Sequence, residues 1–485
     1  MTTQRSAVLP GGQMAIPAVR ETAPLSPGQE RLINSEFILP DGRWPAHGQP
    51  HRLRPVDTGA VLVNGDLDVD TLQAAVAALI RRQSALRTTF RFPEMLPAAQ
   101  LVTASGPRPL AVHRIPAAND DIPGDQLRHI ASQTPVNPTG RDLFTVQLIR
   151  LNGRRHVVIL QIHHLISDGW SIGVLYRELS ELYNALAERR DPGLAPLPRT
   201  FAQVCASMHH DRESTRMTRQ LRFWAAQLQG PWPQMQFTAT PPGPCNGSTR
   251  VDSERVRIPR DLVRDLRAAG QAAGQRGGLA GPILAALAAS LYAQTGQPDV
   301  RVGTMIANRA HVDVEHLIGY FVNIAVMRIH VGPNLTMERL VASANATVAA
   351  SLDNQEVPIQ DVLQHLRRHC GLADTPLYQV TLALNTMRSQ SLTLASLDCT
   401  DIDIESSGPR LAPTTIEQRW LLEDHGGELR GTLTYKTGTF TKAGIHTCLR
   451  NLDRALHAIM ATHRTVADVI GEFEPYGHAG PRLEA

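Results

Sequence analysis

The sequence predicts an α/β protein that is built as two lobes joined by a connecting segment. Each half of the chain alternates apolar strand patterns with helical patterns, which is the arrangement of α/β folds. The chain has 485 residues, which is too long for a single ordinary hydrophobic core, so two lobes are expected. Residues 196–250 separate the halves and end in a stretch rich in proline and glycine, as linkers do.

These patterns divide the chain into five segments. Residues 1–22 are rich in proline, glycine and polar side chains and are expected to be a flexible tail, as are residues 473–485. Between them we place an N-terminal lobe at 23–195, a crossover helix and linker at 196–250, and a C-terminal lobe at 251–472.

Composition excludes several classes of protein. A net charge of +3 gives no basis for binding nucleic acid or a membrane surface. The chain has no apolar stretch long enough to cross a bilayer and no secretory leader, so we expect a cytoplasmic protein. The 5 cysteines show no metal-binding or redox spacing and are expected to be reduced thiols.

The first lobe opens with helices. Pro27 is expected at the first position of a helix whose N-cap is Ser26. A second helix carries Leu72, Val76 and Leu79 on one face, and it runs into a β-rich stretch at 86–90.

A hairpin and a helix follow. The alternating residues 143–151 and the apolar run 157–162 predict two paired strands that turn at Asn152-Gly153. The run 157–162 contains β-branched residues and is broken only by Gln161, so that strand is expected to be buried on both faces. Leucines at helical spacing from Leu175 to Leu186 then predict an amphipathic helix.

The second lobe repeats the alternation of helices and strands. The predicted elements are helices at about 260–273 and 279–294, a strand at 299–306, a hairpin that turns at Gly426-Gly427, and a C-terminal helix that carries Ile445 to Ile459.

A polar loop, His163 to Gly169, lies between the buried strand and its helix, where α/β folds place their chemistry. A histidine packed in a core beside an Asp-Gly turn is the simplest interpretation. A metal site is disfavoured, because His163 and His164 point to opposite faces of an extended strand and no cluster supplies further ligands. We therefore predict no metal.

A serine hydrolase is another interpretation of the same loop. Residues 169–173 fit G-x-S-x-G, the nucleophile elbow that connects a strand to a helix. In that motif the turn follows the strand at once, whereas residues 165–168 intervene here. Ser171 is also well placed to cap the following helix.

The whole loop has the form HHxxxDG, with His163, His164, Asp168 and Gly169 at the fixed positions. This motif resembles that of the condensation domains of nonribosomal peptide synthetases, in the chloramphenicol acetyltransferase-like superfamily. Other motifs of that family have counterparts in the same order, and the resemblance spans roughly residues 24–470. They are Leu25–Leu32, Leu86–Phe90, Phe223-Trp224, Ala307–Arg309 and Leu317–Asn323.

The resemblance implies two chloramphenicol acetyltransferase-like lobes arranged as a V, with His164 in a tunnel between them. His164 would hold or take the proton of an attacking amine or alcohol, and His163, on the opposite strand face, would act mainly in packing. It also implies roles for residues around the loop. The expected catalytic loop residues include Asp168 and Gly169, the organising residues are Arg309 (as the partner of Asp168) and Trp170, and the residues that line the tunnel are Asn323, Tyr320 and Ser171.

Several members of the superfamily are disfavoured. Heterocyclising variants replace the histidine pair by aspartates, and plant-type acyltransferases carry a DFGWG motif that this chain lacks. Residues 423–428 faintly resemble a motif of epimerising variants but are expected to form a turn.

The expected activity is transfer of an aminoacyl or acyl group to an amine, forming an amide in the biosynthesis of a nonribosomal peptide or other natural product. The donor would be a phosphopantetheine thioester on a carrier protein that arrives in trans, with no cofactor bound to this chain. An ester-forming enzyme or O-acyltransferase with an alcohol acceptor is the alternative, because the motif does not separate the two. A non-catalytic docking module of a synthetase assembly is a further alternative.

Overall fold

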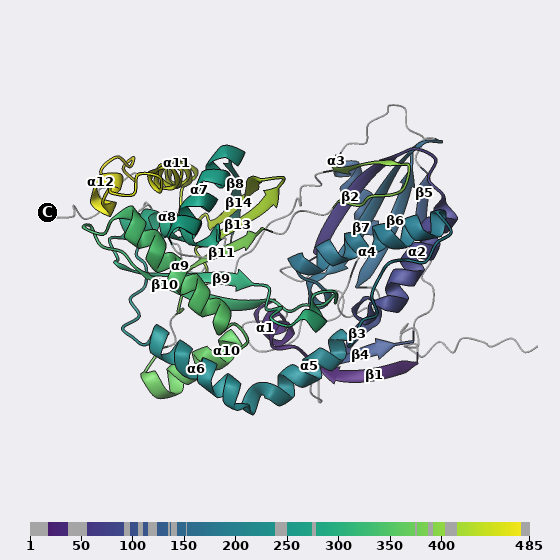
Figure 1. The fold of residues 1–485 in the computed structure, drawn as a ribbon, viewed down its shortest axis with the longest axis horizontal. Helices are drawn as coiled ribbons and strands as arrows, with labels where there is room; N and C mark the ends of the chain where they lie inside the picture. The colour runs from purple at the N-terminus through teal and green to yellow at the C-terminus, as the bar shows by residue number, and fades with distance from the viewer. Residues whose placement is uncertain are drawn as a thin grey trace, which may run out of the picture. The chain divides into compact units, whose positions relative to one another are not determined.

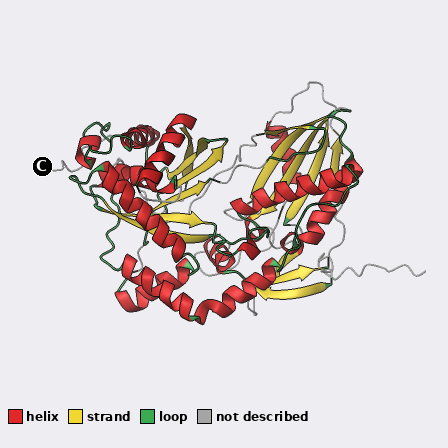
Figure 2. Ribbon diagram, in the orientation of Figure 1, coloured by secondary structure: helices red, strands yellow, loops and turns green. Residues whose placement is uncertain are grey.

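The computed structural model describes most of the chain, and its contacts divide it into two compact units. The described residues are 18–36, 56–91, 98–104, 110–114, 124–133, 136, 143–151, 153–237, 250–273, 278–373, 376–386, 391–402 and 415–476. Unit 1 comprises Met1–Asp211, Arg309–Phe321 and Gln390–Ser407, and unit 2 comprises Arg212–Asn308, Val322–Ser389 and Gly408–Ala485. Each unit contains both helices and strands (Figures 1 and 2).

The central sheet of unit 1 is mixed and has five strands in the order β12-β2-β7-β6-β5. The strands are β2 (Val56–Asn64), β5 (Ala111–Arg114), β6 (Phe144–Arg150), β7 (Arg155–His163) and β12 (Asp398–Ile402). The predicted hairpin is confirmed, because β6 and β7 pair antiparallel. Its expected turn includes Asn152, which lies outside the described residues. The strand predicted to be buried on both faces is β7, in the middle of the sheet.

Helices cover both faces of this sheet (Figure 1). On one face, Leu127 and Ile130 of α3 (Gly124–Gln133) pack in a cluster with Val157 and Ile159 of β7. Residues alternate along a strand, so the buried Val158 faces the other way, toward the predicted amphipathic helix α4 (Gly169–Ala187) and its neighbour α2 (Val69–Arg82).

A smaller antiparallel sheet of unit 1 has the order β1-β4-β3. Its strands are β1 (Val19–Pro24), β3 (Thr88–Arg91) and β4 (Ala99–Thr103), and the nearby helices are α1 (Pro27–Glu36), η1 (Ser84–Arg87) and α5 (Phe201–His210). Strand β1 begins inside the segment 1–22 that was expected to be a flexible tail, because it pairs with the distant β4. The expected start of α1 is present, since Ser26 Oγ accepts from the backbone N–H of Gln29 at 3.1 Å.

Unit 2 is organised around a mixed six-stranded sheet in the order β10-β9-β11-β13-β14-β8. The strands are β8 (Val251–Ile258), β9 (Asp299–Ile306), β10 (Asn323–His330), β11 (Val380–Asn385), β13 (Gln418–His425) and β14 (Glu428–Lys436). The predicted strand at 299–306 is β9. The predicted hairpin is β13-β14, and its turn needs glycine because Gly426 and Gly427 have φ of 67° and 94°.

The helices of unit 2 pack on this sheet and on one another. They are α6 (Thr215–Leu228), α7 (Arg260–Ala272), α8 (Ala280–Thr295), α9 (Met337–Asp353), α10 (Ile359–His365), α11 (Lys442–Ala458) and α12 (Val466–Ile470), with the short helical segment η5 (Leu366–Cys370). The turn η3 (Asp211–Glu213) contains the last residue of the first segment of unit 1. Helix α8 is buried along nearly its whole length, because α7, α9, α11 and α12 all contact it. The predictions of α7, α8 and α11 are confirmed.

Two segments of the expected C-terminal lobe, 251–472, belong to unit 1 in the structure. Arg309–Phe321 includes the turn η4 (Val312–Val314), and Gln390–Ser407 includes β12, which pairs antiparallel with β2. Local sequence carries no signal for either association, because each depends on contacts with residues far away in the chain.

Candidate functional site: the loop from His163 to Gly169

The HHxxxDG loop begins where the central strand of unit 1 ends. Strand β7 ends at His163, a single turn η2 (His164–Ile166) follows, and α4 starts at Gly169. His163 is buried and its Nδ1 accepts from the backbone N–H of Leu165 at 3.0 Å. The side chain of His164 is 32% exposed. One histidine therefore supports the turn from inside while the other is available to a ligand.

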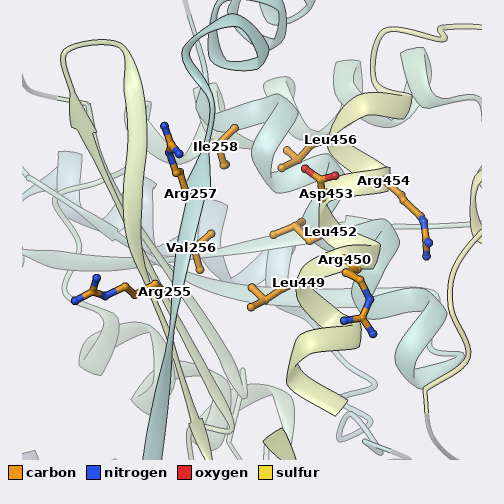
Figure 3. Close-up of a pocket in the computed structure, with 10 residues that line it drawn as sticks. All are labelled: Arg255, Val256, Arg257, Ile258, Leu449, Arg450, Leu452, Asp453, Arg454 and Leu456. Carbon is orange, nitrogen blue, oxygen red and sulfur yellow. The ribbon is translucent and has the colours of Figure 1, made fainter. Parts of the chain in front are cut away.

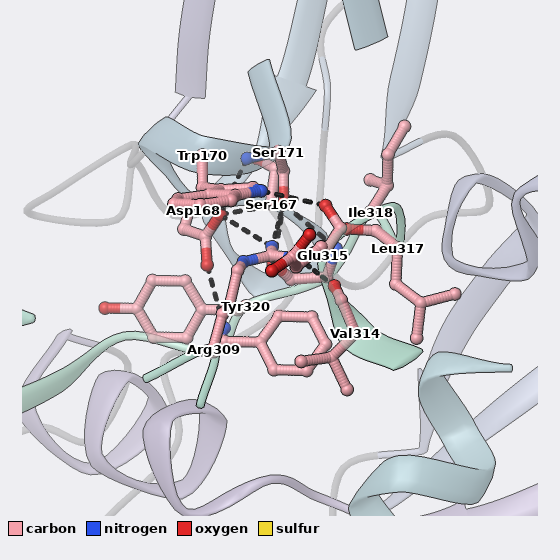
Figure 4. Close-up of polar contacts among 12 residues, drawn as sticks. Ser167, Asp168, Trp170, Ser171, Arg309, Val314, Glu315, Leu317, Ile318 and Tyr320 are labelled. Atoms are coloured by element: carbon pink, nitrogen blue, oxygen red, sulfur yellow. Dashed lines mark hydrogen bonds and ion pairs between the residues drawn. The ribbon is translucent and has the colours of Figure 1, made fainter. Parts of the chain in front are cut away.

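Asp168 is the N-cap of α4 and uses both carboxylate oxygens (Figure 4). Oδ1 accepts from the backbone N–H and the hydroxyl of Ser171, both at 2.8 Å, and Oδ2 accepts from the backbone N–H of Phe321 at 3.0 Å. Ser171 is of a residue type suited to capping, but it is not the cap. Asp168 comes before it in the chain and accepts from the free backbone N–H of Ser171 in the first turn.

The predicted partner of Asp168 is in place. Arg309 Nη2 lies 3.1 Å from Asp168 Oδ1, and each side chain is 1% exposed. The other arm of the guanidinium donates to the carbonyl oxygens of Val314 and Leu317, at 2.6 and 2.8 Å. Burial lowers the pKa of Arg309, and the adjacent carboxylate opposes that shift. A planar fork is what this site requires, because one cation must meet several oxygens at once.

Aromatic rings enclose the guanidinium. Its central carbon lies 4.1 Å from the ring centre of Phe321 and 5.7 Å from that of Trp170. The indole N–H of Trp170 also donates to the carbonyl of Glu315 at 2.8 Å. These contacts favour the cation and exclude water from the ion pair. Trp170 therefore sits where an organising residue was expected.

The segment 309–321 is held at further points. Ser26 Oγ donates to the carbonyl of Tyr320 at 3.1 Å, and Gln83 Oε1 accepts from the N–H of Ile318 at 3.0 Å. Gly319 is required by space, because a Cβ at this position would lie 2.2 Å from the ring of Phe201. The loop and this segment thus form one rigid support beneath His164.

The residues expected to line a tunnel have different surroundings. The ring of Tyr320 is 6.4 Å from that of His164, centre to centre, so Tyr320 lies beside the loop. The hydroxyl of Ser171 is buried and bonds to Asp168, Arg309 and Gly319, which leaves it no capacity for a ligand. Asn323 lies in unit 2, and its side-chain amide donates to the carbonyl oxygens of Gln355 and Val357, so the amide group supports the backbone of that segment.

Two polar residues near His164 escaped the sequence analysis. Gln29 of α1 donates from Nε2 to the carbonyl of Leu165 at 2.7 Å and so holds the turn η2. Asp57 of β2 places Oδ1 at 3.5 Å from His164 Nε2. Gln29 lies in the segment 25–32, which was predicted as a helix start and as a counterpart of a family motif but without a role for Gln29, and Asp57 has no local signal at all.

The site can perform proton transfer at a fixed position. The group suited to that task is the imidazole of His164, which is partly exposed on a loop that Asp168 and Arg309 hold in place. A buried and fully bonded carboxylate such as Asp168 is suited to organising the loop rather than to exchanging protons.

A separate hollow lies in unit 2, between strand β8 and helix α11 (Figure 3). It has a volume of about 400 Å³, an apolar floor that includes Val256 and Leu452, and arginines at its rim. The rim charges are largely compensated, because Arg257 pairs with Glu428 and Arg450 with Glu474. No residue of the loop 163–169 lines it.

The described residues hold no group of His, Cys, Asp or Glu side chains arranged to bind a metal ion. Within the same residues, none of the helices is both long enough and apolar enough to span a membrane.

Comparison with known proteins identifies the family. A model of the condensation domain matches residues 56–469. The chain belongs to the condensation-domain family. This condensation domain is 30% identical to chondramide synthase cmdD of Chondromyces crocatus over 445 residues. That alignment covers 91% of this chain and 11% of the synthase. It spans about a tenth or less of the length of the curated relatives that it matches.

Solved structures show the same fold. The condensation domain from Monacolin K polyketide synthase MokA aligns with a TM-score of 0.76 at 18% identity, covering 93% of this chain and 100% of that one. The X-domain in its complex with OxyB from teicoplanin biosynthesis aligns with a TM-score of 0.72 at 22% identity, covering 94% and 98%. The predicted fold class, two α/β lobes of the chloramphenicol acetyltransferase-like type, and the predicted family are confirmed.

Proposed function

We propose that this condensation domain is an acyltransferase that forms an amide bond. The donor is an acyl or aminoacyl thioester on the phosphopantetheine of a carrier protein, and the acceptor is an amine. The acceptor nitrogen attacks the thioester carbonyl carbon, the C–S bond breaks, and the thiol leaves with a proton. The phosphopantetheine arrives as part of the substrate.

One observation carries this proposal: His164 presents an exposed imidazole edge on a loop that buried groups immobilise. A free α-amine has a pKa of about 7.7–8.0, so roughly a tenth is already neutral at pH 7 and positioning is its main requirement. His164 is placed to accept a proton as the C–N bond forms. Asp168, Arg309 and Trp170 act through His164 by fixing its loop.

A docking module without catalysis is the second candidate. It is favoured by the similarity to the X-domain, whose solved complex contains OxyB. An intact HHxxxDG loop is required for chemistry and has no evident purpose in docking alone, so we rank the acyltransferase first.

The test measures, by intact-mass spectrometry, the loss of the acyl group from acyl-carrier proteins. Candidate acyl carriers are incubated with the enzyme and either an amine or the matching alcohol, beside reactions without enzyme. Faster loss with the amine than in the enzyme-free control supports amide formation. Loss with the alcohol alone assigns ester formation, and loss equal to the enzyme-free control with every carrier favours the docking module.

A further inference from the structure

Two carboxylates, those of Asp168 and Asp57, lie in or beside the loop, and they differ in how many hydrogen bonds they accept. Asp168 is buried, and its oxygens accept hydrogen bonds from Ser171, Arg309 and Phe321. The side chain of Asp57 is 39% exposed, and among the described residues its carboxylate lies within ion-pair distance of His164 alone, with 3.5 Å between Oδ1 and Nε2. Asp57 therefore holds a negative charge that no arginine or lysine of the described chain neutralises.

Strand pairing explains how Asp57 comes to this position. Strand β2 runs antiparallel to β7, with Val56 opposite His163 and Asp57 opposite Ile162. The first residues of β2 thus lie beside the end of β7, and the carboxylate reaches His164 in the turn that follows. The register of the sheet therefore sets the backbone position of Asp57 beside the end of β7.

The neighbouring phenol does not compensate the charge. Tyr176 of α4 lies against β2, where a Cβ on Gly59 would be 2.1 Å from its hydroxyl oxygen. Burial raises the pKa of Tyr176 to about 12, and the charges of Asp401 and Asp57 raise it further in the same direction. Tyr176 therefore stays neutral at physiological pH and provides neither a cation nor a base.

The two nitrogens of His164 have different surroundings. Nδ1 is buried and has no hydrogen-bond partner among the described residues, whereas Nε2 faces Asp57 at 3.5 Å. In a Ser-His-Asp triad the carboxylate holds the ring nitrogen that points away from the substrate. Here the carboxylate shares the accessible side of the ring. Asp57 therefore occupies the place of a substrate-binding group rather than that of a triad member.

We propose that Asp57 binds the ammonium form of the acceptor beside His164 and thereby selects amines over alcohols. This inference rests on the proposed function, because it assigns the acceptor class of the same site. At pH 7 most of a free α-amine carries a positive charge, which a carboxylate attracts and which an alcohol lacks. Asp57 is thus a specificity-determining residue, and His164 remains the group that moves the proton.

The chemistry balances with these two residues. Asp57 holds the ammonium, and His164 Nε2 takes one of its protons and releases that proton to solvent. The freed lone pair forms the C–N bond with the thioester carbonyl carbon, and the C–S bond then breaks. His164 passes a second nitrogen proton to the departing sulfur. The net products are an amide, a thiol and one proton.

The test is a binding measurement that needs no donor. Calorimetry at pH 7 compares 2-phenylethylammonium with 2-phenylethanol as probes, on the full chain and on Asp57→Asn. We expect the wild type to prefer the ammonium by about tenfold and Asp57→Asn to lose that preference, with affinity for the alcohol unchanged. Asp401→Asn is the matched control: it removes a charge from the same sheet, at β12, and should leave both affinities as they are.

Three results would overturn the proposal. In the first, the wild type shows no preference for the ammonium, or binds neither probe. In the second, Asp57→Asn weakens the binding of both probes equally; in the third, Asp401→Asn loses the preference as well. Failure of acyl transfer with the preference intact would count against the proposed function and leave the role of Asp57 standing. Normal transfer with no preference would count against Asp57 alone.

Discussion

Asp168 and Arg309 form a buried ion pair, with 3.1 Å between Oδ1 and Nη2 and 1% exposure of each side chain. Asp168 caps the helix that follows the HHxxxDG loop, and Arg309 also donates to the carbonyl oxygens of Val314 and Leu317. The pair therefore connects the HHxxxDG loop to the segment 309–321. Its disruption should therefore affect folding as well as the proposed catalysis.

Asp168→Ala should lower the free energy of unfolding by about 3–5 kcal/mol, because it leaves the Arg309 charge buried and unpaired. Asp168→Asn, which is nearly isosteric, should retain more structure than activity. Denaturant unfolding measures the stability of both variants, and acyl transfer measures their activity. His164→Ala is the control for stability, since the partly exposed imidazole should contribute little to it. An Asp168→Ala variant that melts like the wild type but is inactive would show that Asp168 takes part in the chemistry.

Arg309→Lys should destabilise the protein by about 2–4 kcal/mol, although it keeps the charge. An ammonium cannot reach Asp168, Ser171 and two carbonyls from one plane, as the guanidinium does. Arg264→Lys is the matched control, because Arg264 is 68% exposed and its surface ion pairs contribute about 0–1 kcal/mol. Equal unfolding midpoints for the two variants would contradict the role of the fork.

Sequence patterns predicted the parts of this site that depend on local order. The apolar run at 157–162 and the leucines after it predicted β7 and α4, and the family resemblance supplied Arg309 as the partner of Asp168. Asp57 was missed because its proximity to His164 arises from the β2-β7 register. No pattern within β2 alone distinguishes it from any polar residue at a strand end.

The same limit explains why the surroundings of Ser171 and Asn323 were not predicted. Ser171 fitted a helix cap by residue type, but the cap is chosen by which oxygen reaches the free N–H groups, and Asp168 lies nearer the helix start. Asn323 was expected beside a ligand, yet its amide is used by the carbonyls of 355 and 357. Strand β12 joins the sheet of unit 1 through contacts over more than 300 residues, such as Asn64 with Asp398.

Gly319→Ala should cost about 1–3 kcal/mol, because the added methyl group meets the ring of Phe201 at 2.2 Å. Gly173→Ala is the matched control. Nothing lies within 4 Å of its Cβ position in α4, so alanine should stabilise the helix by roughly 1 kcal/mol. Thermal melting separates the two, and Phe201→Leu should restore part of the loss. A Gly319→Ala variant as stable as wild type would refute close packing at this point.

Stability should fall on acidification through His156. Burial in β7 lowers the pKa of His156, and the charge of Arg150 lowers it further. The unfolded chain, with a histidine pKa of about 6.5, therefore binds the proton more readily than the folded one. The contribution of His156 is complete above that pH and is lost as the pH falls through the lower folded pKa. Unfolding midpoints from pH 8 to 5 should decline less in His156→Leu; identical slopes in both proteins would contradict this assignment.

The proposed role of His164 in moving the proton during acyl transfer is tested most directly by a single-turnover comparison of His164→Ala with wild type. The rate of acyl loss from a carrier thioester is followed by intact mass with a saturating amine acceptor. His457→Ala, which removes a histidine that is 62% exposed, serves as the control. We predict a rate lower by about 10²–10⁴ for His164→Ala, with unchanged folding and a normal rate for His457→Ala. Equal rates for His164→Ala and wild type would contradict this role of His164.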